Sequence, residues 1–274
     1  MQVLPSKELA PYIKHYLFLE NTDRAIQKLR LFSDGNTGIV FSFQNRLISG
    51  INKETKEYLP SSFLYGQLDG FKDIYSDHEF TLVIVVFQPN GMNQLLQIPA
   101  YEFQNSILNL EDIFDQKGLD LQEKLSEGVN YGQKIELLNH FFKTLLDKKT
   151  FSNQLIINTS LDFILAHKGY FSLKQLAGYT NYTERHLERK FKECVGLSPK
   201  KFGSVVRLHH FLKLLKDKTS DVNLTSIGYD AGFSDQSHLI KEFKKHTGIT
   251  PREYLYSTKK LTNNLIKTSS SLVF

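Results

Sequence analysis

The sequence has little cysteine and no long apolar run. Its one cysteine, Cys194, excludes a disulfide within the chain and any cysteine-rich zinc site, and it suits a reducing compartment. The longest apolar run, residues 82–87, is far shorter than the roughly 20 residues that cross a bilayer. The first residues lack a signal-peptide pattern. We therefore expect a cytoplasmic protein with no membrane segment.

Patterns that carry catalysis are also missing. The first 150 residues hold three histidines, His15, His78 and His140, which are far apart and form no H-x-H pair. A metal-dependent enzyme needs clustered ligands on neighbouring strands, and only His78 beside Glu79 comes near that requirement. No Gly-rich phosphate loop, nucleophile elbow or pair of carboxylates occurs. We expect no catalytic residue, no metal and no cofactor.

Cys194 has two interpretations. A catalytic thiol would have to be exposed and ionised. Cys194 instead falls on the inner side of a predicted helix, where a small core residue is expected.

Charge is unevenly distributed along the chain. The net charge is +5, but residues 151–274 hold 19 basic and 10 acidic side chains, whereas residues 1–150 hold 15 basic and 19 acidic ones. A basic C-terminal half beside an acidic N-terminal half places a polyanion-binding surface in the C-terminal half.

Two similar passages lie in tandem in that basic half, at residues 183–202 and 235–254. Five landmark pairs share one offset of 52 residues: Leu187/Leu239, Phe191/Phe243, Gly196/Gly248, Pro199/Pro251 and Phe202/Tyr254. A constant offset indicates a duplicated supersecondary unit.

Each copy has the residue types that begin and end a short helix, a turn and a second helix. The Leu and Phe landmarks are four residues apart, on one face of a helix. Thr183 and either residue of the Ser234-Asp235 pair are expected N-caps, and Gly196 and Gly248 are expected C-terminal glycines. Apolar helices are predicted just upstream, around 172–177 and 224–228. This order, with a basic polar face on the second helix, is typical of a helix-turn-helix.

The second copy resembles a known family. The stretch Ile227-Gly-Tyr-Asp-Ala-Gly-Phe-Ser-Asp-Gln-Ser-His-Leu-Ile-Lys-Glu-Phe-Lys-Lys-His-Thr-Gly-Ile-Thr-Pro-Arg-Glu-Tyr254 is similar to the signature of AraC/XylS-type transcription regulators. The resemblance covers about residues 155–259. Gly228 replaces a usual Ala, and Leu239 stands where an aromatic residue is frequent, and both differences concern packing. The resemblance implies a bacterial regulator, most of which activate transcription by contacting RNA polymerase, with an N-terminal cupin-like barrel that often binds an effector.

The N-terminal half is predicted to be rich in β structure. Short runs of aromatic and β-branched residues alternate with turn signals, as in an all-β sandwich or barrel. The run 81–87 is apolar on both faces, as a strand buried on both sides would be. Aromatic residues on these strands either line an apolar pocket or fill the core, and the core is the more common case: Phe41, Phe43, Phe63, Tyr65, Phe80 and Phe87.

We therefore predict an α+β protein with a β-rich, cupin-like barrel domain at 1–150, trailing helices included, and an all-α double helix-turn-helix domain at 151–260. Residues 261–274 are expected to be a loose tail. The helix predicted at 132–146 has an apolar stripe that is wider than one packing face needs. It is either sandwiched between the two domains or a dimerisation helix, and a polar linker is expected at 147–153.

The helix at 199–216 is expected to be a spacer that holds two recognition helices in successive major grooves, about 34 Å apart. Side chains on the outer face of these helices would read bases: Arg185, Glu188, Arg189, Gln236, Ser237 and Lys241, with Ile240 against a thymine methyl. Five basic residues are expected to contact phosphates: Lys192, Lys200, Lys201, Lys244 and Arg252. For each of these charges the alternative is an exposed side chain that touches nothing.

The sequence thus predicts a sequence-specific transcription regulator that binds double-stranded promoter DNA, and the resemblance implies that it is an activator. RNA polymerase, a small-molecule effector and a second copy of the chain are the further expected partners. Two alternatives stay open. One is a cupin-type enzyme fused to a DNA-binding module, which would show metal-dependent turnover. The other is a protein-interaction module, with which no small molecule would change DNA affinity.

Overall fold

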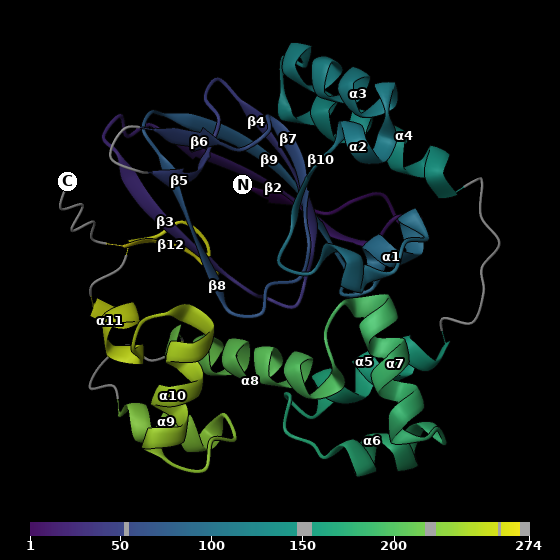
Figure 1. Cartoon of the computed structure of the whole chain (residues 1–274), viewed down its shortest axis with the longest axis vertical. Coiled ribbons are helices and arrows are strands. Elements are labelled where there is room, and N and C mark those ends of the chain that lie inside the picture. Colours follow the sequence, from purple (N-terminus) through teal and green to yellow (C-terminus); the bar gives the residue numbers. More distant parts are fainter. Residues whose placement is uncertain (52–54, 147–154, 217–222, 257–258, 269–274) are drawn as a thin grey trace.

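The protein consists of a two-sheet sandwich resting on a layer of helices (Figure 1). The computed structural model describes residues 1–51, 55–146, 155–216, 223–256 and 259–268. The predicted linker at 147–153 lies outside the described residues. Among the described helices, none is long and apolar enough to cross a membrane.

The sandwich contains two antiparallel sheets of six strands each. In spatial order, the first sheet contains β1 (Gln2–Val3), β2 (Ile13–Asn21), β9 (Phe80–Phe87), β4 (Gly38–Phe43), β7 (Ser62–Tyr65) and β10 (Ile107–Asn109). The second contains β11 (Lys259–Lys260), β12 (Leu265–Thr268), β3 (Gln27–Phe32), β8 (Phe71–Ser76), β5 (Ile48–Ile51) and β6 (Lys56–Tyr58). Within the described residues the two sheets are not joined by strand pairing, so the barrel is not closed, although the predicted β-rich N-terminal domain is confirmed.

Strand β9 contributes side chains to the two cores that lie on opposite faces of the first sheet. Leu82, Ile84 and Val86 point into the core between the sheets, whereas Val83, Val85 and Phe87 point into a second core under helices. Successive side chains of a strand alternate between faces. The run therefore had to be apolar at every position.

Helices cover the outer face of the first sheet (Figure 1). They are α1 (Gly91–Leu96), the short 3-10 helix η1 (Ala100–Phe103), α2 (Glu111–Phe114), α3 (Gln116–Glu127) and α4 (Tyr131–Leu146). The buried residues of α4, Leu138 and Phe142, belong to the core of this N-terminal part. The expectation that this helix is sandwiched between the two domains is therefore wrong, because the wide apolar stripe is used against the sheet, α1 and α3.

The C-terminal helices form the second layer. They are α5 (Leu155–Ala166), α6 (Leu173–Thr180), α7 (Glu184–Val195), α8 (Pro199–Lys216), α9 (Leu224–Asp230), α10 (Gln236–Thr247) and α11 (Pro251–Tyr256). The tandem repeat corresponds to α6–α7 and α9–α10, with α8 between them (Figure 1). Each unit has its own core, and α8 contributes Phe202 to the first and Leu208 and Leu212 to the second. The spacer helix therefore packs against both units.

The C-terminal segment differs from the expectation of a loose tail. Residues Leu265–Thr268 form β12, which pairs with β3 of the sandwich. Leu265 and Ile266 are apolar and almost fully buried, and the edge of β3 supplies backbone hydrogen-bond partners that the local sequence does not reveal. The tail expectation is wrong for these residues, and 269–274 lie outside the described residues.

Candidate nucleic-acid interface

The first recognition helix, α7, begins and ends where the sequence predicts. The Thr183 hydroxyl accepts a hydrogen bond from the backbone N–H of His186 at 3.3 Å, which caps the helix. Gly196 ends it in the left-handed conformation at φ 85°, which costs glycine little. Leu187 and Phe191 are fully buried. The predicted base-reading side chains are all exposed on the opposite face: Arg185, Glu188 and Arg189.

Two residues that the sequence reasoning missed lie beside them. The His186 ring stacks on Tyr182, with centroids 5.2 Å apart and planes at 18°. The Arg189 Nη2 atom lies 3.4 Å from His186 Nδ1, and its Nη1 atom lies 3.7 Å from the Glu193 carboxylate. Arg189 is thus aligned by neighbours on its own helix. An exposed aromatic residue just before the cap was the sequence signal for this arrangement.

The second recognition helix, α10, repeats the design. The Asp235 carboxylate accepts from the backbone N–H of His238 at 2.8 Å, and this bond lowers the pKa of Asp235. Gly248 ends the helix at φ 73°. Leu239 and Phe243 are buried, whereas the predicted base-reading side chains are exposed: Gln236, Ser237, Ile240 and Lys241.

A surface groove runs along this second helix. It has a volume of about 570 Å³ and joins the start of α9, the start of α10 and α11. Gln236 and Ile240 line it together with Arg252, a predicted phosphate contact. Asn223, Thr225 and Tyr256 also line it, and the sequence reasoning did not select them because they come from flanking helices. Two predicted base-reading residues and a basic residue therefore share one concave surface.

Both recognition helices have their C-terminal ends toward the sandwich. The end of α7 packs on η1, and α10 packs on β3 and β8. The helices that precede them, α6 and α9, lie on the side away from the sheets (Figure 1). A helix of 12 residues is about 18 Å long. The N-terminal turns that carry Arg185 and Gln236 are therefore separated from the sandwich by that length.

The predicted phosphate contacts fall into two groups. Lys200, Lys244 and Arg252 are exposed. Lys192 and Lys201 are exposed too, but Lys201 forms an ion pair with Asp69 of the sandwich at 2.6 Å, and the Lys192 ammonium lies 6.0 Å from the centre of the Tyr101 ring. These two lysines contact the N-terminal part, so a phosphate role for Lys201 would require its ion pair to open.

The side-chain geometry gives little support to a catalytic thiol or to a metal site. Burial, with the Glu193 carboxylate next in importance, raises the pKa of the Cys194 thiol to about 11, so the thiol stays protonated and the core interpretation holds. His78 lies 3.0 Å from Asp77, while Glu79 pairs with Arg24. In the described part of the chain, no group of three His, Cys, Asp or Glu residues could hold a metal ion.

A Ser–His–Glu cluster between α8 and α10 is structural. Ser204 Oγ lies 2.8 Å from His246 Nε2 and 2.9 Å from Glu242 Oε2. A catalytic triad needs the carboxylate on the other ring nitrogen of the histidine. His246 Nδ1 is instead buried without a hydrogen-bond partner among the described residues. The cluster joins the spacer to the second recognition helix.

Two of the hollows among the described N-terminal residues bear on ligand binding. One, of about 70 Å³, lies between the sheets and is lined mostly by apolar side chains, among them Val40, Ile74, Ile84 and Leu265. Of the predicted aromatic residues, Phe63 and Tyr65 line it, whereas Phe41 and Phe87 fill the core under the helices.

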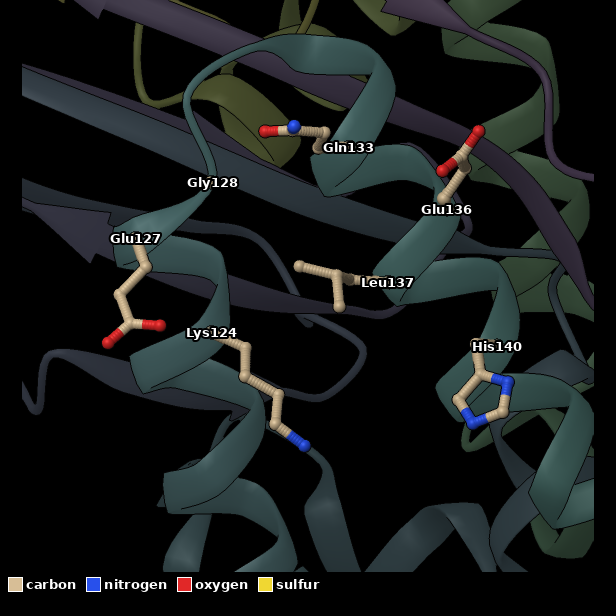
Figure 2. A pocket seen from close by; sticks show the side chains of 7 residues that line it. All are labelled: Lys124, Glu127, Gly128, Gln133, Glu136, Leu137 and His140. Carbon is tan, nitrogen blue, oxygen red and sulfur yellow. The ribbon is translucent and has the colours of Figure 1, made fainter.

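The other hollow is an open groove of about 480 Å³ between α3 and α4 (Figure 2). Figure 2 shows Lys124 and Glu127 on α3, with the side chain of Leu137 on α4 directed between the two helices. Its other labelled side chains are polar: Gln133, Glu136 and His140. The apolar hollow between the sheets is therefore better suited to an apolar ligand than this groove.

A helix-turn-helix domain model matches residues 176–257, which span both units described above. Residues 176–257 therefore form an AraC-type helix-turn-helix domain. A second family model, a domain of unknown function (DUF6597), matches residues 1–109.

Two curated relatives are named as transcription regulators. An uncharacterised HTH-type transcriptional regulator of Staphylococcus aureus (strain MSSA476) is 31% identical over 136 residues, 47% of this chain. That alignment spans only 18% of the relative's own length. The lactose operon transcription activator of Staphylococcus xylosus is 29% identical over 183 residues, 60% of this chain and 64% of the relative.

Solved structures give more distant likenesses. The apo form of a ToxT variant from Vibrio cholerae strain SCE256 covers 88% of this chain and 96% of its own at 13% identity, with a TM-score of 0.49. An AraC-type transcriptional regulator from Chromobacterium violaceum is 29% identical, covers 37% of this chain and 90% of its own, and has a TM-score of 0.34.

Proposed function

We propose that this AraC-type protein regulates transcription by binding promoter DNA with both helix-turn-helix units. The observation that carries the proposal is the pair of capped recognition helices at the two ends of one spacer helix. The 18 residues of α8 span about 27 Å, a length close to the roughly 34 Å between successive major grooves on one side of B-DNA. DNA would approach from the side of α6 and α9, opposite the sandwich.

Within this mode, Arg185, Arg189 and Gln236 would read base edges. An Arg guanidinium matches guanine, and a Gln amide matches adenine. Glu188 would accept from cytosine, and Ile240 would contact a thymine methyl. Ser237 and Lys241 complete the expected set of base readers.

The second helix supports this assignment in a specific way. Gln236, Ile240 and Arg252 line the same groove. A base contact from α10 and a phosphate contact from α11 could therefore form on one stretch of duplex. Lys200 and Lys244 are exposed and would add affinity without sequence preference.

The test is a selection of binding sites from randomised duplexes with the full chain. Arg189→Ala and Gln236→Ala should each cost about 1–3 kcal/mol on the selected site and relax preference at one or two base positions. Lys244→Ala is the matched control, because it removes a charge from α10 and should weaken binding to all sequences alike. If both variants select the same sites as the wild type, these side chains do not read bases.

Activation rather than repression of transcription is proposed from the relatives. One of them is named as a transcription activator. We propose that this chain also activates, in the cytoplasm, and that it contacts RNA polymerase from its promoter site. A homodimer formed through α3 and α4 is the corresponding proposal for assembly, and it would place the groove of Figure 2 at or near the contact. Sedimentation of the purified chain tests it.

The N-terminal part would serve as the sensor. The hollow between the sheets is lined by apolar residues, and Lys72 is the charged residue among its described lining. These features favour a small molecule with an apolar body and one anionic group. Native mass spectrometry of the purified chain, followed by denaturing release, should detect such a molecule. If no bound mass is found and decanoate does not bind in calorimetry, an interaction module without a ligand becomes the better account.

A further inference from the structure

One residue of the C-terminal strand β12 lines the hollow, and the next residue packs in the core of the second helix-turn-helix unit. Leu265 lines the hollow and packs with Leu29, Val40 and Leu82 between the sheets. Ile266 is fully buried in the other direction, in the cluster that contains Phe243 and Tyr254. Adjacent residues of a strand face opposite sides. One short strand thus separates the sensing hollow from the DNA-binding unit.

Further contacts tie this strand to both parts. Its four residues pair with β3, with Ile266 opposite Arg30. The Phe32 backbone N–H donates to the Asn264 carbonyl at 3.0 Å, and the Asn264 side-chain amide donates to the Phe32 carbonyl at 3.2 Å. From the helical side, the Tyr254 hydroxyl donates to the Asn263 carbonyl at 3.1 Å. The segment therefore holds α11 and the edge of β3 together.

The volume of the hollow limits which ligands can enter without a change in the protein. Its volume of about 70 Å³ is roughly half of the ~150 Å³ that accommodates benzene in an engineered cavity. Small-molecule sites usually measure about 300–1,000 Å³. A ligand of ordinary size can enter only if part of the wall moves.

Among the walls, the short strands β10 and β12 can move at the lowest cost, and of these two β12 is the one that packs in the core of the second helix-turn-helix unit. The lining strands β4, β9 and β8 have a neighbour on each side, so their displacement opens two ladders. Strand β12 has only four residues, and its outer neighbour β11 has two. Its displacement would also reach the DNA-binding part, because Ile266 would leave the second core.

We propose that β12 is a latch that couples the hollow to the second helix-turn-helix unit: a ligand that expands the hollow displaces Leu265, and with it Ile266 releases α10 and α11 from the sandwich. This inference rests on the proposed sensing function, because it assumes that the hollow takes a ligand. The latch itself can be tested without one.

The experiment is hydrogen–deuterium exchange of the full chain, followed by mass spectrometry of peptides from β3 and α10. Ile266→Ala should speed exchange in both peptides by at least about tenfold, because a buried side chain shared by both elements is lost. Ile107→Ala is the matched control. Ile107 lines the same hollow but lies on β10 of the other sheet, so this variant should leave α10 unchanged.

Ile266→Val and Ile107→Val replace the two variants if the alanine forms do not fold, and the same ranking is expected. Unchanged exchange of α10 in the Ile266 variant would overturn the latch, as would an equal effect of the Ile107 variant.

A second arm adds decanoate, an apolar chain with one carboxylate, to the wild type. Binding accompanied by faster exchange in β3 and α10 supports the latch. Binding without any change in α10 overturns the coupling and leaves the sensing function standing. If decanoate does not bind, the ligand class proposed for the hollow is wrong, and the Ile266 comparison alone decides whether the latch exists.

Discussion

The ion pair between Lys201 and Asp69 offers a sharp test of how the two parts of the molecule compete with DNA. Lys201 stands at the start of α8, and its ammonium lies 2.6 Å from the Asp69 carboxylate on the sandwich. If Lys201 contacts a DNA phosphate, the duplex must displace this carboxylate. Asp69→Asn should then increase DNA affinity, because it removes the competitor without shortening the side chain.

The magnitude follows from exposure. The two side chains are 48% and 38% exposed, and exposed ion pairs contribute about 0.2–1 kcal/mol. The gain in DNA affinity should therefore be at most about fivefold, since roughly 1.4 kcal/mol corresponds to tenfold. Lys201→Ala should weaken binding to all sequences and reduce the slope of log affinity against log salt by about 0.9.

The assay is fluorescence anisotropy on a selected site and a random duplex, at several salt concentrations between about 50 and 200 mM. Lys213→Ala controls for loss of a positive charge elsewhere on α8, where Lys213 is exposed. If Asp69→Asn does not raise affinity and Lys201→Ala leaves the salt slope intact, Lys201 serves domain docking alone. The phosphate role predicted for it would then be refuted.

Two further predictions concern the second recognition helix. Phe243→Ala should lower the free energy of unfolding by about 3–5 kcal/mol, because Phe243 is fully buried among residues of α8, α10 and α11. Urea denaturation measures this change. A loss well below that range would mean that the ring does not stabilise the core. The pKa of Asp235 is lowered by the backbone N–H of His238, so its capping stabilises α10 above the ordinary Asp pKa and is lost as pH falls through the lowered value. Exchange at the start of α10, divided by the intrinsic exchange rate at each pH, should therefore rise at acid pH in the wild type and depend less on pH in Asp235→Asn. Equal pH dependence of this ratio in both proteins would contradict the cap.

The helical half was predictable because its signals are local. Caps, left-handed glycines and the four-residue spacing of Leu187 and Phe191 act within one or two turns of the chain. The helix boundaries at Thr183, Gly196 and Gly248 therefore agree with the sequence prediction. The apolar run of β9 was equally informative, since a strand buried on both faces needs apolar residues throughout.

The sheets were harder to predict, because strand pairing joins distant segments. The turn at 33–36 follows β3 and precedes β4, but those strands belong to different sheets. Turn residues specify a reversal of direction and say little about which strand becomes the neighbour. The separation of the barrel into two sheets could not be seen at that level for the same reason.

By itself, the sequence determined the duplicated helix-turn-helix unit, its caps and the exposed faces of α7 and α10, since helical geometry makes these properties local. Only the tertiary structure decided that Leu265–Thr268 pair with β3 and that Lys201 meets Asp69. These contacts join segments more than a hundred residues apart. Their stability comes from surfaces that exist only after both parts have folded, and no local pattern records them.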